Sequence, residues 1–94
     1  MAYKEDTTFA LVKARLNRVK GDASLDEYLD ARIKAADAEL TNSGIRLDAD
    51  NPEDAMLLVD TVAWQYLNRD NMAGTPEWLR LRRRERYLSQ RRGG

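Results

Sequence analysis

Hydrophobic and polar residues alternate most regularly between Asn51 and Asp70, with the period of an α-helix. A rotation of about 100° per residue gathers the apolar side chains on one broad arc and the polar ones opposite. The arc comprises Ala55, Met56, Leu57, Val59, Val62, Ala63, Trp64, Tyr66 and Leu67, and the polar side comprises Asp54, Thr61, Gln65, Asn68 and Arg69. One neighbouring helix cannot cover so wide an arc, so we expect this helix to contact several others or a second subunit.

The residues that open this stretch favour the start of a helix. Asn51 is a good N-cap because its side-chain oxygen can accept from a free first-turn amide. Pro52 suits the first helical position, where no amide donor is needed. Glu53 and Asp54 then place negative charge at the positive end of the helix dipole. The pattern predicts a long central helix over residues 52–70.

A first, shorter helix is predicted over residues 7–20. Its apolar side chains recur at helical spacing on one narrow face, at Phe9, Val12, Leu16 and Val19. Thr7 or Thr8 can cap its start, and Gly21 can end it.

A second helix is predicted over residues 24–42. Ser24 and Glu27 have the spacing of a capping box, in which each side chain accepts from the backbone amide of the other residue. The apolar stripe that follows consists of Leu25, Tyr28, Leu29, Ile33, Ala36 and Leu40. Turn-forming residues at 42–44 end the helix. The connector at 45–50 alternates apolar and polar residues and is short enough for a brief extended segment.

A fourth helix is predicted over residues 76–88, because Thr75, Pro76 and Glu77 repeat the pattern of cap, proline and acid. One of its faces carries Trp78, Leu81 and Leu88 with Glu85, whereas Leu79 lies among Arg82, Arg83 and Arg86 on another. Residues 89–94 are expected to form a flexible C-terminal tail until a partner orders them.

These elements predict an all-α fold, a small bundle of about four helices with a long central apolar helix and a basic C-terminal helix. The chain of 94 residues suits one domain, which we place at residues 1–88. The longest apolar run, at 55–59, is too short to cross a bilayer, and the N-terminal residues lack the basic start and apolar run of a signal peptide. We therefore expect a soluble protein that does not associate with membranes.

Charge is unevenly distributed although the formal net charge is zero. Residues 1–79 hold 9 basic and 15 acidic residues, a balance of −6, and residues 80–94 hold 7 arginines against Glu85, a balance of +6. This polarity indicates either a basic segment that meets an anionic partner or copies that pack the basic segment of one against the acidic body of the next. The alternative is a solvated arginine-rich helix end, which the helix dipole favours anyway.

The composition argues against catalysis. The chain has no cysteine and no histidine, so the commonest nucleophile, general base and metal ligands are missing. No glycine-rich phosphate loop or nucleophile motif occurs. Asp48, Asp50 and Asn51 resemble part of a calcium loop, but Pro52 and Glu53 stand where such a loop needs another oxygen ligand and a glycine. We expect no enzyme activity, no catalytic residues, no cofactor and no metal.

Charged residues that project into the apolar stripes need partners or water. Arg32 and Glu39 do so on the second helix, and Asp60 does so on the central helix. We expect Arg32 or another cation to pair with Asp60, within the fold or across a subunit boundary. The alternative is that Asp60 lies at the rim and is solvated.

The C-terminal helix also contains the residue types that nucleic-acid-binding proteins use. Its arginines can bind phosphates, and Trp78 and Tyr87 can stack on bases. No known DNA-binding motif is present, however, and the acidic body would repel a duplex. A small helical DNA-binding or packaging-accessory protein that uses this helix is the alternative function.

The order of elements resembles the small all-helical head–tail connector proteins of tailed bacteriophages and prophages, also called adaptor or head-completion proteins. The resemblance is carried by DNPEDAMLLVDTVAWQYLNRD at 50–70, TPEWLRLRRRERYL at 75–88 and LDEYLDARIKAA at 25–36. These stretches cover about half of the chain and are packing patterns rather than a chemical signature. The connector between the second and third helices is very short, which departs from the family, so a channel-facing loop must be small or lie elsewhere in the chain.

The resemblance implies a structural virion protein with no enzyme activity. Such proteins assemble as a homo-oligomeric ring beneath the portal, in the neck between capsid and tail, after a period in the host cytoplasm. The ring is expected to follow the twelve-fold symmetry of the portal, to extend the channel through which genomic DNA passes without sequence-specific binding, and to dock a stopper or tail-completion protein. Proteins of this family bind the portal with their C-terminal segment. The resemblance therefore implies a portal-binding role for Trp78, Arg80, Arg82, Arg83, Arg84, Arg86 and Tyr87.

A subunit interface is expected on the flank of the central helix that holds Leu57, Asp60 and Trp64. This flank is the part of the apolar arc that would meet the C-terminal helix or the next copy. Opposite charge on the two ends of the chain suits a head-to-tail contact, in which one patch meets a different patch on the next copy.

Overall fold

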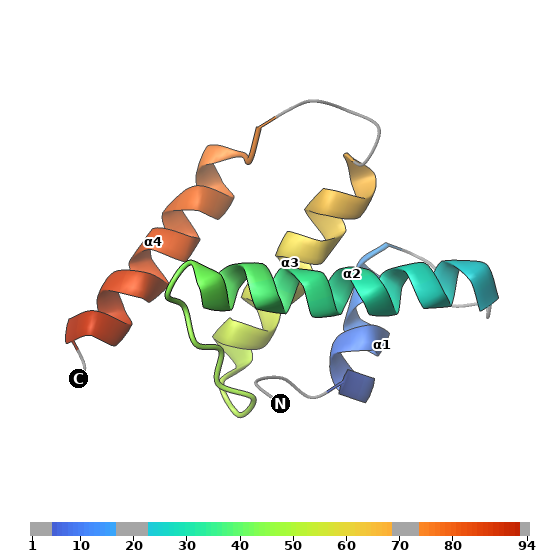
Figure 1. The fold of residues 1–94 in the computed structure, drawn as a ribbon, viewed down its shortest axis with the longest axis horizontal. Helices are drawn as coiled ribbons and strands as arrows, with labels where there is room; N and C mark the ends of the chain where they lie inside the picture. The colour runs from blue at the N-terminus through green and yellow to red at the C-terminus, as the bar shows by residue number, and fades with distance from the viewer. Residues whose placement is uncertain (1–4, 17–22, 69–73, 93–94) are drawn as a thin grey trace.

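The computed structural model describes residues 5–16, 23–68 and 74–92, and these fold into helices without strands (Figure 1). The elements are α1 (Glu5–Arg15), α2 (Ala23–Asn42), α3 (Pro52–Leu67) and α4 (Glu77–Arg92). The predicted all-α class is confirmed. The predicted ranges of the second and third helices agree closely with α2 and α3, although Arg69 and Asp70 lie outside the described residues.

Helix α3 is the centre of the molecule and packs against α1, α2 and α4. In Figure 1, α2 crosses α3, while α4 lies on the opposite side of α3 from α1. One continuous core results, made of Val12, Leu29, Ile33, Ala36, Leu40, Ile45, Leu47, Leu57, Leu58, Val59, Val62 and Leu79. The expectation that the broad apolar arc contacts several helices is therefore confirmed.

The N-terminus of α3 has the predicted cap. The Asn51 Oδ1 atom accepts a hydrogen bond of 2.9 Å from the Glu53 amide, and Pro52 is the first helical residue. At the other end, the Asn68 side chain donates to the Trp64 carbonyl over 2.9 Å. Both ends of the helix therefore satisfy backbone groups that would otherwise lack partners.

Helix α2 ends in a Schellman motif. The Ile45 amide donates to the Leu40 carbonyl over 2.9 Å, and the Gly44 amide donates to the Thr41 carbonyl over 3.0 Å. Gly44 has a φ of +90°, a conformation that favours glycine. Ile45 and Leu40 are both buried, which supplies the apolar contact that accompanies this motif. The predicted stop at 42–44 is confirmed.

The predicted start of the first helix was wrong. Helix α1 begins at Glu5, so Thr7 and Thr8 lie inside the helix instead of capping it. Thr8 is buried, with 2% of its surface exposed, because it lies on the face that packs against the body. Helix α1 ends at Arg15, earlier than the predicted end at residue 20, and Val19 and Gly21 lie outside the described residues. Helix α2 begins at Ala23, one residue before the predicted cap Ser24.

The polar side of α3 was also predicted incorrectly. Asp54 and Thr61, expected to face solvent, are 1% and 2% exposed, whereas Met56 and Leu67, expected in the apolar arc, are 40% and 61% exposed. The reason is that other elements pack against this side of α3: Arg86 of α4 and the connector amide of Asp48 contact Asp54, and Gln65 donates to Glu39 of α2 over 2.9 Å. Thr61 satisfies its hydroxyl within the helix by donating to the Leu57 carbonyl over 2.7 Å.

Helix α4 packs with its arginine face inward. Leu79, which lies among the arginines, is 1% exposed, while Trp78, Leu81 and Leu88 are 47%, 49% and 39% exposed. The helix also continues to Arg92, so the prediction of a flexible tail was wrong for residues 89–92. This orientation needs acidic partners on the body for the inward arginines.

None of the described helices is long and apolar enough to cross a membrane. The connector between α2 and α3 buries Ile45 and Leu47 and exposes Arg46 and Asp48.

Candidate functional site

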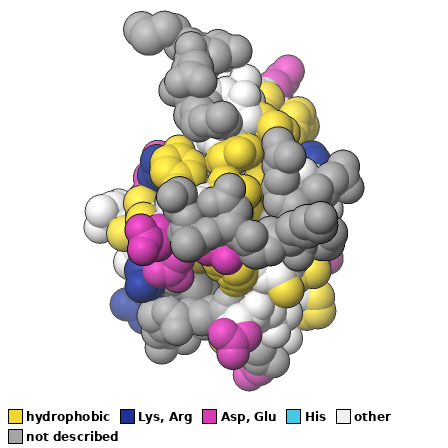
Figure 2. All heavy atoms as spheres, turned by 90° about the vertical axis from the view of Figure 1, so that its right-hand side faces the viewer, with side chains coloured by type: hydrophobic (Ala, Val, Ile, Leu, Met, Phe, Trp, Pro, Cys, Tyr) yellow, Lys and Arg dark blue, Asp and Glu magenta, His cyan; other side chains and the backbone are white. Residues whose placement is uncertain are grey.

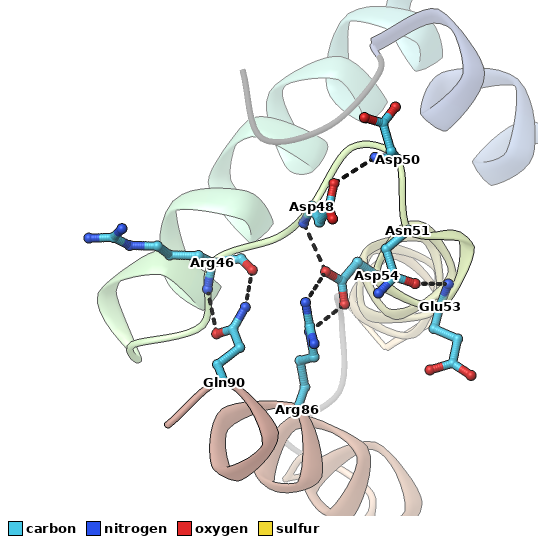
Figure 3. Close-up of polar contacts among 8 residues, drawn as sticks. All are labelled: Arg46, Asp48, Asp50, Asn51, Glu53, Asp54, Arg86 and Gln90. Carbon is cyan, nitrogen blue, oxygen red and sulfur yellow. Dashed lines mark hydrogen bonds and ion pairs between the residues drawn. The ribbon is translucent and has the colours of Figure 1, made fainter. Parts of the chain in front are cut away.

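Asp54 anchors α4 to the start of α3. Its carboxylate is almost fully buried, with 2% of the side chain exposed, and forms a two-point ion pair with Arg86. The Arg86 Nε and Nη2 atoms lie 2.7 Å from Asp54 Oδ1 and 2.8 Å from Oδ2 (Figure 3). The Asp48 amide donates to the same Oδ2 over 2.8 Å. One carboxylate thus joins α3, α4 and the connector between α2 and α3.

Gln90 provides a second contact between α4 and the connector. Its Oε1 atom accepts from the Arg46 amide over 3.0 Å, and its Nε2 atom donates to the Arg46 carbonyl (Figure 3). The side-chain amide therefore pairs with both backbone groups of one residue, as a neighbouring strand would. The Arg46 side chain extends away from this contact.

Asp60 is paired within the fold. The Arg82 Nη1 atom lies 2.5 Å from Asp60 Oδ2, and the Arg15 Nε atom lies 3.8 Å from Oδ1. The expectation that a cation would meet Asp60 is confirmed, but the cation is not Arg32. The Arg32 Nε atom is buried and has no hydrogen-bond partner among the described residues.

The structure divides the residues expected to bind a partner into two groups. Arg82 and Arg86 face α3, and Arg83 donates from its Nη2 atom to Ser43 Oγ over 3.3 Å. These arginines hold α4 in place. Tyr87 is half-buried against the core, and its hydroxyl accepts from Arg91 over 2.8 Å.

The remaining residues of the expected portal interface face solvent. Arg80 and Arg84 are exposed and form no ion pair with a described residue. Trp78 is 47% exposed, with the Arg82 guanidinium 6.0 Å from its ring centre. We call Trp78, Leu81 and Leu88 the apolar stripe of α4, and Arg80 and Arg84 its basic edge. Both lie on the surface of α4 that points away from the body.

A groove of about 590 Å³ lies between α4 and the first half of α3, beside the ion pair that joins the two helices. It is lined by Pro52, Glu53, Asp54, Met56, Leu57, Arg82, Glu85, Arg86 and Ser89. Asp54 and the two arginines are already paired, whereas Glu53 and Glu85 are exposed and form no ion pair with a described residue. The groove therefore has an acidic rim, and Met56 adds exposed apolar surface to it.

Among the residues expected at a subunit interface, Leu57 is 3% exposed and has almost no surface to offer a second copy. Trp64 is half-buried against the core, and Asp60 meets α4 through Arg82. The predicted meeting of this flank with the C-terminal helix is confirmed at Asp60.

The end of the molecule away from α4 presents another face, drawn in Figure 2. Figure 2 shows hydrophobic side chains near the middle of this face, Asp and Glu side chains around them, and Lys and Arg side chains mainly at its left edge. Among the aromatic residues, Tyr28 of α2 and Tyr66 of α3 pack with ring centres 6.0 Å apart.

Within residues 5–16, 23–68 and 74–92, no group of three or more potential ligands is placed to hold a metal ion. The residues that resembled a calcium loop have structural partners, since Asp48 Oδ1 accepts from the Asp50 amide over 2.9 Å and Asn51 caps α3.

The sequence patterns did not identify Asp54 or Gln90 as important contacts. Asp54 was interpreted as a first-turn acid that interacts with the helix dipole, and Gln90 was placed in the tail. Their partners lie 32 and 44 positions away in the chain, so no local signal marks them.

Comparison with protein-family models, curated proteins and solved structures finds no match to this chain.

Proposed function

We propose that this chain is a structural head–tail connector protein of a tailed bacteriophage or prophage. It forms a homo-oligomeric ring beneath the portal, extends the DNA channel and docks a stopper or tail-completion protein. In this proposal it has no enzyme activity, needs no cofactor, and resides in the neck of the virion after assembly in the host cytoplasm.

The observation that carries the proposal is the outward surface of α4. A single-chain protein gains stability by burying Trp78 and Leu81, yet here they face solvent on a helix that also exposes Arg80 and Arg84, which form no ion pair with a described residue. Exposed aromatic and aliphatic side chains next to arginines have the composition of a protein-binding surface. The C-terminal segment is also the part of the chain that the resemblance assigns to the portal.

The inward arginines support the same proposal by making this surface rigid. Because Arg82 and Arg86 fix α4 on α3, the apolar stripe is held in one orientation before a partner arrives. A preformed surface loses less conformational entropy on binding than a flexible tail does.

The proposal is tested by mixing the purified chain with a portal protein from the same genome and examining the mixture by electron microscopy and native mass spectrometry. We expect a ring of this chain at one end of the portal. Trp78→Ala should weaken the complex at least about tenfold, because a central aromatic anchor contributes about 2 kcal/mol or more. Tyr28→Ala is the control, since Tyr28 is an exposed aromatic on α2 at 38%. The absence of any complex would refute the proposal.

DNA binding is the second candidate, favoured by the exposed Arg80, Arg84 and Trp78 on the same helix. The case for DNA binding is weaker because Arg82 and Arg86 form ion pairs within the fold, which leaves fewer arginines to bind phosphates. Titration of duplex DNA at two salt concentrations separates the two functions. Tight, salt-sensitive binding by the monomer would favour DNA binding, and a connector should bind duplex DNA weakly.

A further inference from the structure

Two surfaces of the described chain carry unpaired charge of opposite sign. The basic edge of α4 presents Arg80 and Arg84, and the groove between α3 and α4 presents Glu53 and Glu85 on its rim. The other charged residues that line the groove are neutralised, because Asp54 pairs with Arg86 and Arg82 pairs with Asp60. The rim acids and edge arginines therefore remain available for an external partner.

The two surfaces lie on different sides of α4. With a rotation of about 100° per residue, the groove residues Glu85 and Ser89 lie about 140° around the helix from the centre of the basic edge. A partner in the groove therefore does not cover the basic edge. One molecule can use both surfaces at the same time.

We propose that the basic edge of α4 in one copy docks in the α3–α4 groove of a second copy. The arginines of the edge meet Glu53 and Glu85, and their aliphatic stems cover the exposed Met56 side chain. This contact deepens the proposed function, on which it rests for its role in a ring.

Charge also determines the symmetry of the contact. A two-fold dimer of like patches would place the basic edge against a basic edge or the acidic groove against an acidic groove, and both arrangements are repulsive. A two-fold dimer of unlike patches would have to form both contacts at once, although the two surfaces point about 140° apart around α4. The attractive arrangement joins unlike patches and leaves each copy with one free groove and one free edge. Such a head-to-tail contact continues from copy to copy and closes into a ring when its rotation divides a full turn.

The first test is sedimentation velocity of the full chain over a range of concentrations. At low salt we expect association beyond a dimer, because each added copy leaves a free groove and a free edge. At about 1 M salt, where the screening length is about 3 Å, association should weaken at least about tenfold. A chain that stays monomeric at low salt at every concentration up to its solubility overturns the proposal.

The second test exchanges the charges. Arg84→Glu cancels the positive charge of the basic edge, and Glu53→Arg cancels the negative charge of the groove rim. Each variant alone should therefore be monomeric. An equimolar mixture should associate again at least as far as a dimer, because the unaltered groove of the Arg84→Glu variant meets the unaltered edge of the Glu53→Arg variant. If either single variant associates like the original chain, or the mixture stays monomeric, the contact does not lie between these surfaces.

Glu27→Arg and Lys34→Glu are the matched controls, since both residues are exposed on α2 and the substitutions make the same changes of charge. Both controls should associate like the original chain, and loss of association in them would overturn the assignment. Circular dichroism must show that all variants are folded. A monomeric chain that still binds the portal would refute this contact and retain the proposed function. Head-to-tail association without portal binding would support the contact and refute the function.

Discussion

At the scale of single residues, Asp54 determines how the C-terminal helix docks. Its buried carboxylate accepts from Arg86 and from the Asp48 amide, so one side chain fixes two segments on α3. Removing one partner of a buried ion pair is far costlier than losing an exposed pair, because the other charge stays buried without compensation.

Asp54→Ala should therefore lower the free energy of unfolding by about 3 kcal/mol, measured by urea denaturation. Arg86→Ala should cost less after Asp54 has been removed, with a coupling energy of about 1 kcal/mol or more in a double-mutant cycle. Asp30→Ala is the control, because its pair with Lys34 is exposed and should contribute less than about 0.5 kcal/mol. Additive effects of the first two substitutions would contradict the role of the ion pair.

Gly44 is required for a steric reason as well as a conformational one. Its φ is +90°, and a Cβ atom there would lie 2.8 Å from Cε1 of Tyr87. Gly44→Ala should destabilise the protein by about 2 kcal/mol. Gly74→Ala serves as control, because a Cβ atom at Gly74 would meet nothing within 4 Å. Equal melting temperatures for the two variants would show that the contact between Gly44 and Tyr87 tolerates a side chain.

Asp37 is expected to make stability depend on pH. Burial raises the pKa of its carboxyl above the ordinary value, and its Oδ1 atom has no hydrogen-bond partner among the described residues. The folded state therefore holds the proton more tightly than the unfolded state, so this group's contribution to stability falls as pH rises from about 3.8 through the raised pKa.

Asp37→Asn should consequently be more stable than the original chain at pH 7, and the difference should disappear below the ordinary carboxyl pKa of about 3.9. Thermal melts at a series of pH values measure it. A difference independent of pH would mean that ionisation of Asp37 does not cause the effect.

At the scale of elements, α4 is oriented by its charges and by one leucine. The apolar stripe alone would turn Trp78, Leu81 and Leu88 inward, but the structure buries Leu79 and pairs Arg82 and Arg86 with carboxylates of α3. Two ion pairs on one helix face, together with the buried Leu79, outweigh an apolar stripe that Glu85 interrupts.

The two leucines provide a direct comparison. Leu79→Ala should cost about 2–3 kcal/mol, because it leaves a cavity in the core. Leu81→Ala should change the free energy of unfolding by less than about 0.5 kcal/mol in the monomer, because Leu81 is 49% exposed. Chemical denaturation at high salt, where self-association is weakened, measures both. A larger effect at Leu81 would mean that α4 packs in the opposite orientation.

At the scale of the whole molecule, α4 packs against α3 and against no other described helix. The α1–α3 body shares an apolar core, whereas α4 adds Leu79 and Tyr87 to that core and depends otherwise on polar contacts. We infer that α4 opens at a lower free energy than the body does.

Hydrogen exchange should detect this difference. In about 1 M salt, protection of α4 amides should fall about tenfold, because Arg82 is partly exposed and its pair with Asp60 is screened, while α2 and α3 amides should change little. The measurement uses Arg84→Glu, so that self-association does not protect α4. An equal loss of protection in all helices would indicate that the molecule opens as one unit.

The sequence by itself determined the features that depend on neighbouring residues. Asn51 and Pro52 predicted the start of α3, the turn at 42–44 predicted the end of α2, and apolar spacing predicted an all-α class, because capping and helical periodicity act within a few residues. The tertiary structure alone decided which face of α4 is buried and which carboxylates hold it. Those contacts join residues more than 20 positions apart, as in Asp60 with Arg82 and Asp54 with Arg86, so their energies depend on how the helices pack.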